Sequence, residues 1–309
     1  SDDLKRWLNE HLDFDKIRKG YCFPRTDISS DKSHKHLVHD MTNKIDVPLN
    51  RMFNDAVNAY NGGYNIVIYT GIIPQGGEKR DWDISSAYSE AGHLLPDIAP
   101  GLGAVKFKEF HNLAANQFSR IVKAAEKING PYTVGVGIFD IEYPSDYKGF
   151  VITPKNVNEG PRYFRKIHEV TLSYTDAYTA WSCGAKVFTH RLSFVRQSRI
   201  ILGTLDGISQ EGHIQDSFQK RREQCVHGSP EDKMNKNVVN QCYGVTAEGL
   251  KKKTSPDYNN GRPYYVPFSR ITNPLKAIQF TSITRLHIIT LQRAIWKIDP
   301  KAVFLNNVT

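Results

Sequence analysis

The sequence predicts an α+β protein, because helical and strand-like hydrophobic patterns both occur along the chain. Residues 49–60 repeat apolar side chains with a helical period, whereas residues 132–143 (YTVGVGIFDIEY) alternate them as a strand does. The composition supports a globular protein, since 39% of the 309 residues are hydrophobic and 24% are charged. At this length we expect one large domain or two ordinary ones.

The first half of the chain starts with two predicted helices. A helix is predicted over 4–19, and polar residues 26–39 then predict a loop. The helix over 49–60 is expected to end at Gly62-Gly63, before a strand over 64–70. Residues 71–100 have several Pro or Gly clusters and no sustained period, so we expect a long irregular excursion there.

Residues 113–129 predict the most clearly amphipathic helix of the chain. Its apolar face carries Phe118, Ile121, Val122, Ala125 and Ile128. The opposite face carries polar side chains within roughly 60° of arc, namely Asn116, Arg120, Lys123 and Lys127. The strand over 132–143 follows, and its glycines require a close neighbour, which we expect to be this helix.

The second half of the chain predicts more strands. Residues 167–174, 185–194 and 199–205 are rich in β-branched and aromatic side chains. Residues 206–262 are polar, and we expect loops with one short helix. The apolar segment 280–298 fits either a closing strand or a helix. We therefore divide the chain into 1–150, a helical N-terminal region with a core, and 151–309, a basic strand-rich region packed on that core or extending it.

The positive charge of the chain is uneven. Its net charge is +9, yet residues 1–150 carry 18 basic and 20 acidic side chains and residues 151–309 carry 23 and 12. A surplus of this size attracts polyanions, and nucleic acids are the commonest. An acidic membrane surface, or a role in solubility alone, would also account for the charge. No apolar run reaches the roughly 20 residues of a membrane-spanning helix.

The four cysteines lack the spacing of a zinc site and fit either free thiols or two disulfides. Their even number and the Asn307-Val308-Thr309 sequon slightly favour a secreted protein. The chain starts at Ser1 without an initiator Met, so we expect a processed form. Phosphate-loop, GxSxG, HExxH and Rossmann motifs do not occur, which removes the commonest enzyme classes.

The segment Glu90-Ala91-Gly92-His93-Leu94-Leu95-Pro96, followed by an Asn-bearing helix and a strand, resembles the DNA/RNA non-specific endonucleases, a ββα-metal (His-Me finger) family. The resemblance covers about residues 64–145 and implies a ββα-metal-like core. It also implies Mg²⁺-dependent hydrolysis of DNA and RNA, with His93 as the general base and Asn116 as the metal ligand. Glu126 is the carboxylate that the helix offers the metal, about 80° round from Asn116.

The chemistry explains this combination of residue types. An imidazole with a pKa near 6.5 can deprotonate water. A hydrated Mg²⁺ with nearby cations can stabilise the phosphate. Arg120 or Arg80 would clamp the phosphate, and Lys123 and Lys127 would steer the substrate.

In the second half, aromatic and basic residues are interleaved, a pattern that suits stacking of bases and pairing with phosphates. The candidate nucleic-acid-binding residues there are Arg191, Arg196, Arg199, Lys220, Arg221, Arg222, Lys251, Lys252, Lys253, Arg262, Tyr264, Tyr265 and Arg270.

Other interpretations stay open. His93 could be a hydrogen-bonded structural residue, Asn116 a helix N-cap, and the cations of 113–129 a solvated stripe. His168 with Glu169, or His190, could form an acid/base pair. The whole chain could bind nucleic acid without cutting it, as a degenerate nuclease or a coat or nucleocapsid-like protein. It could also be a secreted basic interaction protein that meets glycans or lipid.

Overall fold

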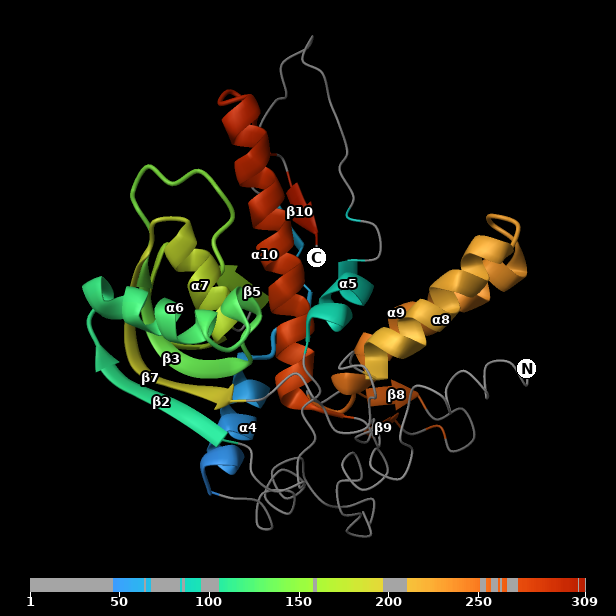
Figure 1. Cartoon of the computed structure of the whole chain (residues 1–309), viewed down its shortest axis with the longest axis horizontal. Helices are drawn as coiled ribbons and strands as arrows, with labels where there is room; N and C mark the ends of the chain where they lie inside the picture. Colours follow the sequence, from blue (N-terminus) through green and yellow to red (C-terminus); the bar gives the residue numbers. More distant parts are fainter. Residues whose placement is uncertain are drawn as a thin grey trace.

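The computed structural model describes residues 47–63, 65–67, 84, 87–95, 106–157, 160–196, 210–250, 254–256, 261, 263–265, 272–304 and 306–308. These residues form a mixed α+β structure whose four-stranded antiparallel sheet, which we call the central sheet, lies on one side of the molecule, so the predicted fold class is confirmed (Figure 1). The predicted helix over 4–19, the loop over 26–39 and the strand over 199–205 lie outside the described residues.

The central sheet has the strand order β2-β7-β3-β6. Its strands are β2 (Lys106–Leu113), β3 (Gly135–Glu142), β6 (Lys166–Ser173) and β7 (Lys186–Arg196). The strands predicted within 132–143, 167–174 and 185–194 are thus present, whereas β2 was not predicted. Because β2 and β3 precede residue 150 and β6 and β7 follow it, the expected division at 150 passes through one sheet.

Helices cover both faces of this sheet. On one face, α6 (Phe118–Glu126) and α7 (Tyr174–Ser182) pack on a core that includes Phe139, Leu192 and Phe194. On the other face, α4 (Val47–Ala59) packs on Val134, Val136 and Val195. The predicted helix over 49–60 is confirmed as α4. Two short 3-10 helices, η1 (Ala115–Gln117) and η2 (Gly130–Tyr132), flank α6.

The glycines of β3 are approached by β7, so the expected approach by the preceding helix is wrong. A Cβ atom on Gly137 would lie 2.9 Å from the Cα of Leu192 and would collide with the carbonyl oxygen of Arg191. Gly135 lies against the ring of Phe194 in the same way. The glycines therefore let two neighbouring strands and a large buried ring come together.

The helix α10 (Pro274–Ile298) runs past the sheet edge and packs on both α4 and α7 (Figure 1). Asn273 caps it by accepting a hydrogen bond from the N–H of Lys276 at 3.2 Å, and Pro274 occupies its first turn. Its first half is buried on all sides, which explains why the apolar pattern of 280–298 did not distinguish a helix from a strand.

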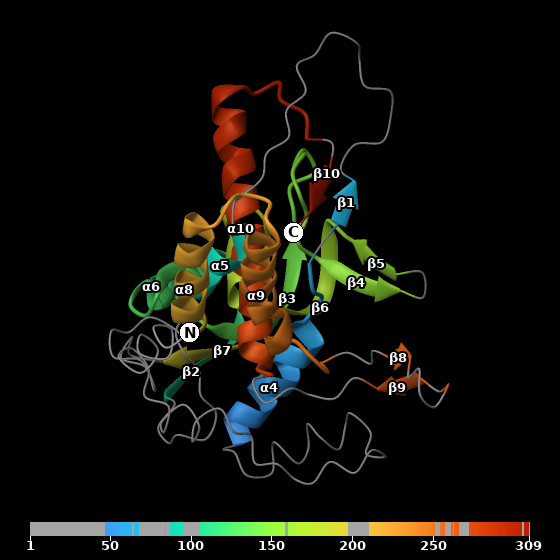
Figure 2. The same cartoon turned by 90° about the vertical axis from the view of Figure 1, so that its right-hand side faces the viewer.

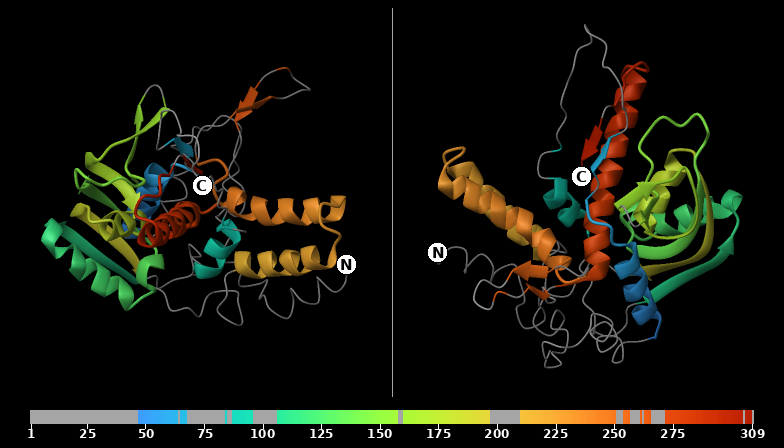
Figure 3. Two further views of the ribbon diagram at one scale, coloured as in Figure 1. Left: turned by 90° about the horizontal axis from the view of Figure 1, so that it is seen from above. Right: turned by 180° about the vertical axis from the view of Figure 1, so that it is seen from behind.

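Residues 206–262 differ from the predicted loops with one short helix. Two long helices, α8 (Gln210–Gln224) and α9 (Pro230–Thr246), form an antiparallel hairpin that projects away from the sheet (Figure 3). Ser229 caps α9 by accepting from the N–H of Asp232 at 3.2 Å. A long hairpin of this kind is polar because both helices remain largely accessible to water.

The remaining elements are small. The helix α5 (Ala87–Leu94) lies within the expected irregular segment and packs on α8, α9 and α10. The described part of the 64–70 strand is β1, which pairs with β10 at the end of the chain. The hairpins β4–β5 and β8–β9 are separate two-stranded sheets, and β8–β9 is set apart from the central sheet (Figure 2). The bounds of these six short strands are β1 (Asn65–Val67), β4 (Pro154–Val157), β5 (Gly160–Tyr163), β8 (Thr254–Pro256), β9 (Pro263–Tyr265) and β10 (Asn306–Val308).

Candidate nucleic-acid interface

The helix α6 separates its apolar and charged residues as the sequence predicts. Phe118, Ile121 and Ala125 are completely buried against the sheet, whereas Arg120, Lys123 and Lys127 are exposed. Within the described part of the chain, these three cations make no ion pair or hydrogen bond through their side chains. The outward face of α6 therefore presents three side chains whose charge no carboxylate neutralises directly.

The proposed base and metal ligand lie at opposite ends of α6. His93 belongs to α5, and the carbonyl oxygen of its neighbour Leu94 accepts a hydrogen bond from the side chain of Asn129 at 3.2 Å. Asn129 follows the C-terminus of α6, while Asn116 precedes its N-terminus. A nine-residue helix is about 13 Å long, so the structure does not bring His93 and Asn116 together.

The proposed metal ligands are also separated. Asn116 precedes α6 and Glu126 is its last residue, so they lie more than about 12 Å apart along the helix axis. A magnesium ion binds oxygen at about 2.0–2.1 Å, and these two side chains cannot share one. Asn116 does not act as an N-cap either, because the residue that caps α6 is Gln117 and its side chain makes no capping bond. Among the residues that the structure describes, no group of three His, Cys, Asp or Glu side chains is arranged to hold a metal.

Of the predicted arginines on β7, Arg191 is engaged inside the protein. Its guanidinium donates to the carboxylate of Asp55 on α4 at 2.6 Å, in a half-buried ion pair that joins the sheet to this helix. Burial raises the pKa of Asp55 more than Arg191 lowers it. Arg196 ends the strand, and its side chain, like all of Arg199, lies outside the described part.

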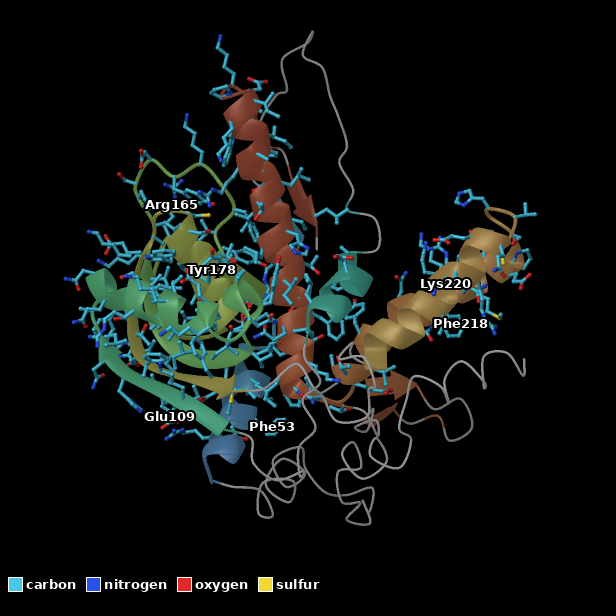
Figure 4. The ribbon with its side chains drawn as sticks, in the orientation of Figure 1. Phe53, Glu109, Arg165, Tyr178, Phe218 and Lys220 are labelled. Atoms are coloured by element: carbon cyan, nitrogen blue, oxygen red, sulfur yellow. The ribbon has the colours of Figure 1, made fainter. Side chains whose placement is uncertain are left out.

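The basic cluster on α8 is divided between surface and interior contacts. Lys220 is exposed (labelled in Figure 4). The guanidinium of Arg221 lies 5.8 Å from the ring centre of Phe218, at cation–π distance. Arg222 donates to the buried Asp232 of α9 at 2.9 Å and so ties the two helices of the hairpin together. The hairpin over 210–246 carries five basic and five acidic residues, so its net charge is zero.

Several other predicted residues fall in parts of the chain that the structure does not describe. Arg80, Arg262, Arg270 and the triplet Lys251, Lys252 and Lys253 lie outside the described residues. Tyr264 and Tyr265 belong to β9, and their side chains are outside the described part.

The structure reveals one charged cluster that the sequence did not show as a unit. Asp140 on β3 contacts Nε2 of His190 on β7 at 2.8 Å and Nδ1 of His168 on β6 at 3.4 Å. It also accepts the backbone N–H of Glu169 at 2.8 Å. Glu169 has a φ of +51°, in the left-handed region that turns its N–H toward Asp140. The sequence had indicated His168 with Glu169, or His190, as a possible acid/base pair, but it did not show that Asp140 joins them.

These contacts change the acidity of Asp140. Partial burial raises the pKa of this carboxyl, but the hydrogen bond from the Glu169 N–H and the contacts with the two histidines together lower the pKa by more than burial raises it. The pKa of Asp140 therefore lies below its ordinary value, and the side chain is ionised at neutral pH. Glu109 on β2 (labelled in Figure 4) behaves similarly: burial raises its pKa, and bonds from Ser193 and Arg51 lower it below the usual value.

Two of the cysteines, Cys183 and Cys225, are free thiols, so the alternative of two disulfides is wrong. Among the described residues, no helix combines the length and the apolar character that crossing a membrane requires.

Comparison with known proteins identifies a sequence relative in DNA synthesis. The chain is 24% identical over 268 residues to the primer-independent DNA polymerase PolB of Escherichia coli. The match covers 85% of this chain and 28% of the relative, so the chain spans less than a third of that protein. No family model matches the chain. Among solved structures, Phi29 DNA polymerase complexed with primer-template DNA aligns with a TM-score of 0.45 and 14% identity, over 80% of this chain and 40% of the other.

These findings overturn the resemblance to DNA/RNA non-specific endonucleases. The relative is a DNA polymerase, so the ββα-metal family assignment and the hydrolysis by His93 that it implied are wrong. A short Gly-His-Leu match followed by an Asn-bearing helix proved too weak to define the family. The alternative of nucleic-acid binding without cleavage agrees better with the comparison.

Proposed function

We propose that this chain binds DNA as part of a protein of DNA synthesis. The observation that carries the proposal is the match to the DNA polymerase PolB along 85% of the chain. The unpaired cations on the surface of α6 support it, because phosphate contacts by lysine and arginine supply most of the affinity of proteins for DNA.

The proposed activity includes a dependence on Mg²⁺. Transfer of a phosphoryl group needs metal ions that neutralise the charge developing on the phosphates. The described residues do not form a set of ligands that fits such an ion. We therefore assign no residue of this chain as a metal ligand.

Binding is tested by fluorescence anisotropy with a labelled DNA duplex of arbitrary sequence. We expect the affinity to fall steeply between 50 mM and 200 mM salt, because bound counterions are released from the phosphates. Binding that is absent, or that does not depend on salt, would contradict the DNA proposal.

The synthetic role is tested separately. Labelled deoxynucleotides and Mg²⁺ are supplied to the chain, with and without a primer-template, and incorporation is measured before and after EDTA is added. Incorporation that EDTA abolishes would show that the chain itself carries out synthesis in addition to binding DNA. A chain that binds DNA but incorporates nothing would contradict the synthetic role and leave DNA binding standing.

A further inference from the structure

The structure divides the predicted DNA-binding cations into two groups. Arg191 and Arg222 are paired with Asp55 and Asp232 inside the protein. The cations of α6, by contrast, are exposed and unpaired among the described residues. Forming a DNA contact costs the first group an existing ion pair, and it costs the second group none.

The three cations, two on α6 and Lys127 at its C-cap, are aligned. At 100° per residue, Arg120, Lys123 and Lys127 point within roughly 60° of one another. Arg120 and Lys127 are seven positions apart, which is about 10 Å along the helix axis. Phosphates of one DNA strand follow one another at about 3.4 Å along the duplex axis. A strand of the duplex that runs beside α6 therefore brings several of its phosphates within reach of the three cations.

The charge around α6 also favours binding of the DNA phosphate backbone. Residues 106–127 carry five lysines and arginines but two acids, Glu109 and Glu126, although residues 1–150 as a whole are slightly acidic. Glu109 lies on the α4 side of the sheet, where it bonds to Ser193 and Arg51. Glu126 is thus the single acidic side chain on α6, so the local field is positive.

We propose that the outward face of α6, formed by Arg120, Lys123 and Lys127, is a binding surface for the phosphate backbone of duplex DNA. The inference rests on the proposed DNA binding and adds where the duplex is held. The surface lies on the side of the sheet away from α4, whereas the α8–α9 hairpin projects beyond α10 (Figure 1). It recognises phosphate and carries no sequence information.

The test compares two triple variants of the whole chain in the duplex-binding assay. The first is Arg120→Gln, Lys123→Gln and Lys127→Gln. The matched control removes three exposed cations from the uncharged hairpin, by Lys220→Gln, Lys233→Gln and Lys236→Gln. We expect the α6 variant to lower the slope of log K against log salt by about 2 to 3, since each lost phosphate contact removes about 0.9. Its affinity should fall about tenfold or more at low salt, with a smaller loss in the control.

A substitution of opposite sign sharpens the test. Glu126→Gln removes the single acidic side chain of α6, which lies next to the three cations. We expect this variant to bind the same duplex severalfold more tightly and to keep the fold unchanged. A thermal melt of every variant establishes that the compared proteins are folded. If a melt shows the triple variant unfolded, Glu126→Gln and the single variant Lys123→Gln replace it.

The outcomes separate the two proposals. If the wild type does not bind the duplex, both the proposed function and this inference fail. If the wild type binds and the α6 variant binds equally well, only this inference fails. If the α6 variant keeps its affinity for DNA but loses binding to vesicles of phosphatidylserine and phosphatidylcholine, the surface recognises membranes and the inference is overturned.

Discussion

Two helices of this protein use positive charge in opposite ways. On α10, Arg285 is 2% exposed and donates to both carboxylate oxygens of Asp176, at 2.8 and 2.6 Å. On α6, Arg120 is exposed and unpaired within the described residues. An arginine side chain thus holds structural elements together on α10, whereas on α6 it leaves its charge available to a binding partner. The net charge of a segment therefore predicts a polyanion partner only when its cations are free.

The buried junction of α7 and α10 holds a polar network. Ser282 donates to Asp176 at 2.8 Å and lies 2.7 Å from the hydroxyl of Ser173, the residue that caps α7. Arg285 also donates to the carbonyl oxygen of Gly62, just beyond α4. One arginine therefore connects α7, α10 and the segment that follows α4, which is why the positive charge here is structural.

The largest expected effect is at this junction. Arg285→Met leaves Asp176 buried without its partner, and breaking a buried pair in this way costs about 3–5 kcal/mol. We expect the free energy of unfolding, measured by urea denaturation, to fall by this amount. The double variant Asp176→Leu with Arg285→Met should recover much of it, because it leaves no buried charge. A single variant as stable as the wild type would contradict the structural role of Arg285.

The sheet interior should respond next most strongly. Gly137→Ala places a methyl group against the backbone of β7, at Arg191 and Leu192, and overpacking of this kind costs about 1–3 kcal/mol. The control is Gly244→Ala on α9, where nothing lies within 4 Å of the new methyl group. There we expect stabilisation of about 0.5–1 kcal/mol in the same urea experiment, because alanine favours a helix. If Gly137→Ala and Gly244→Ala changed the free energy of unfolding equally, β3 and β7 would have to lie farther apart at Gly137 than the structure shows.

A smaller effect is expected at the half-exposed cluster on the sheet. Asp140→Asn removes a charge that two histidines and one N–H contact, and we expect a loss of about 1 kcal/mol at neutral pH. The pKa of Asp140 is lowered in the folded protein, so its contribution is full above the ordinary value of 3.8. It is lost as the pH falls through the lower folded pKa.

The pH dependence of this cluster is measured by thermal melts between pH 2 and pH 7. The wild type should lose more stability than Asp140→Asn in the acidic part of this range. If the melting temperatures of the two proteins change equally with pH, the contacts of the Asp140 carboxylate do not stabilise the fold.

The smallest effect on stability is expected on α6. Arg120→Gln, Lys123→Gln or Lys127→Gln should change the free energy of unfolding by about 0.5 kcal/mol or less each, since exposed and unpaired cations add little to the fold. Urea denaturation of the three single variants measures this. A loss comparable to that of Arg285→Met would remove the contrast between the two helices, because it would make the α6 cations structural as well.

Local sequence patterns predicted the elements that have one solvent-exposed face and one buried face. The alternation of Phe118, Ile121, Val122 and Ala125 with exposed cations determined α6, and a similar pattern determined α4. Three of the four strands of the sheet were predicted from β-branched and aromatic residues. Local patterns failed for α10, which is buried all round, and for the polar α8–α9 hairpin, because neither shows a contrast between two faces.

By itself, the sequence determined the α+β class and the excess of basic residues. Tertiary structure alone decided which of those residues are free: it paired Arg285 with Asp176, 109 positions away, and Arg191 with Asp55, 136 positions away. It also gathered His168 and His190 around Asp140 and separated His93 from Asn116. The physical reason is that a helix or strand follows from contacts between near neighbours, whereas a charge finds its partner only when distant segments pack together.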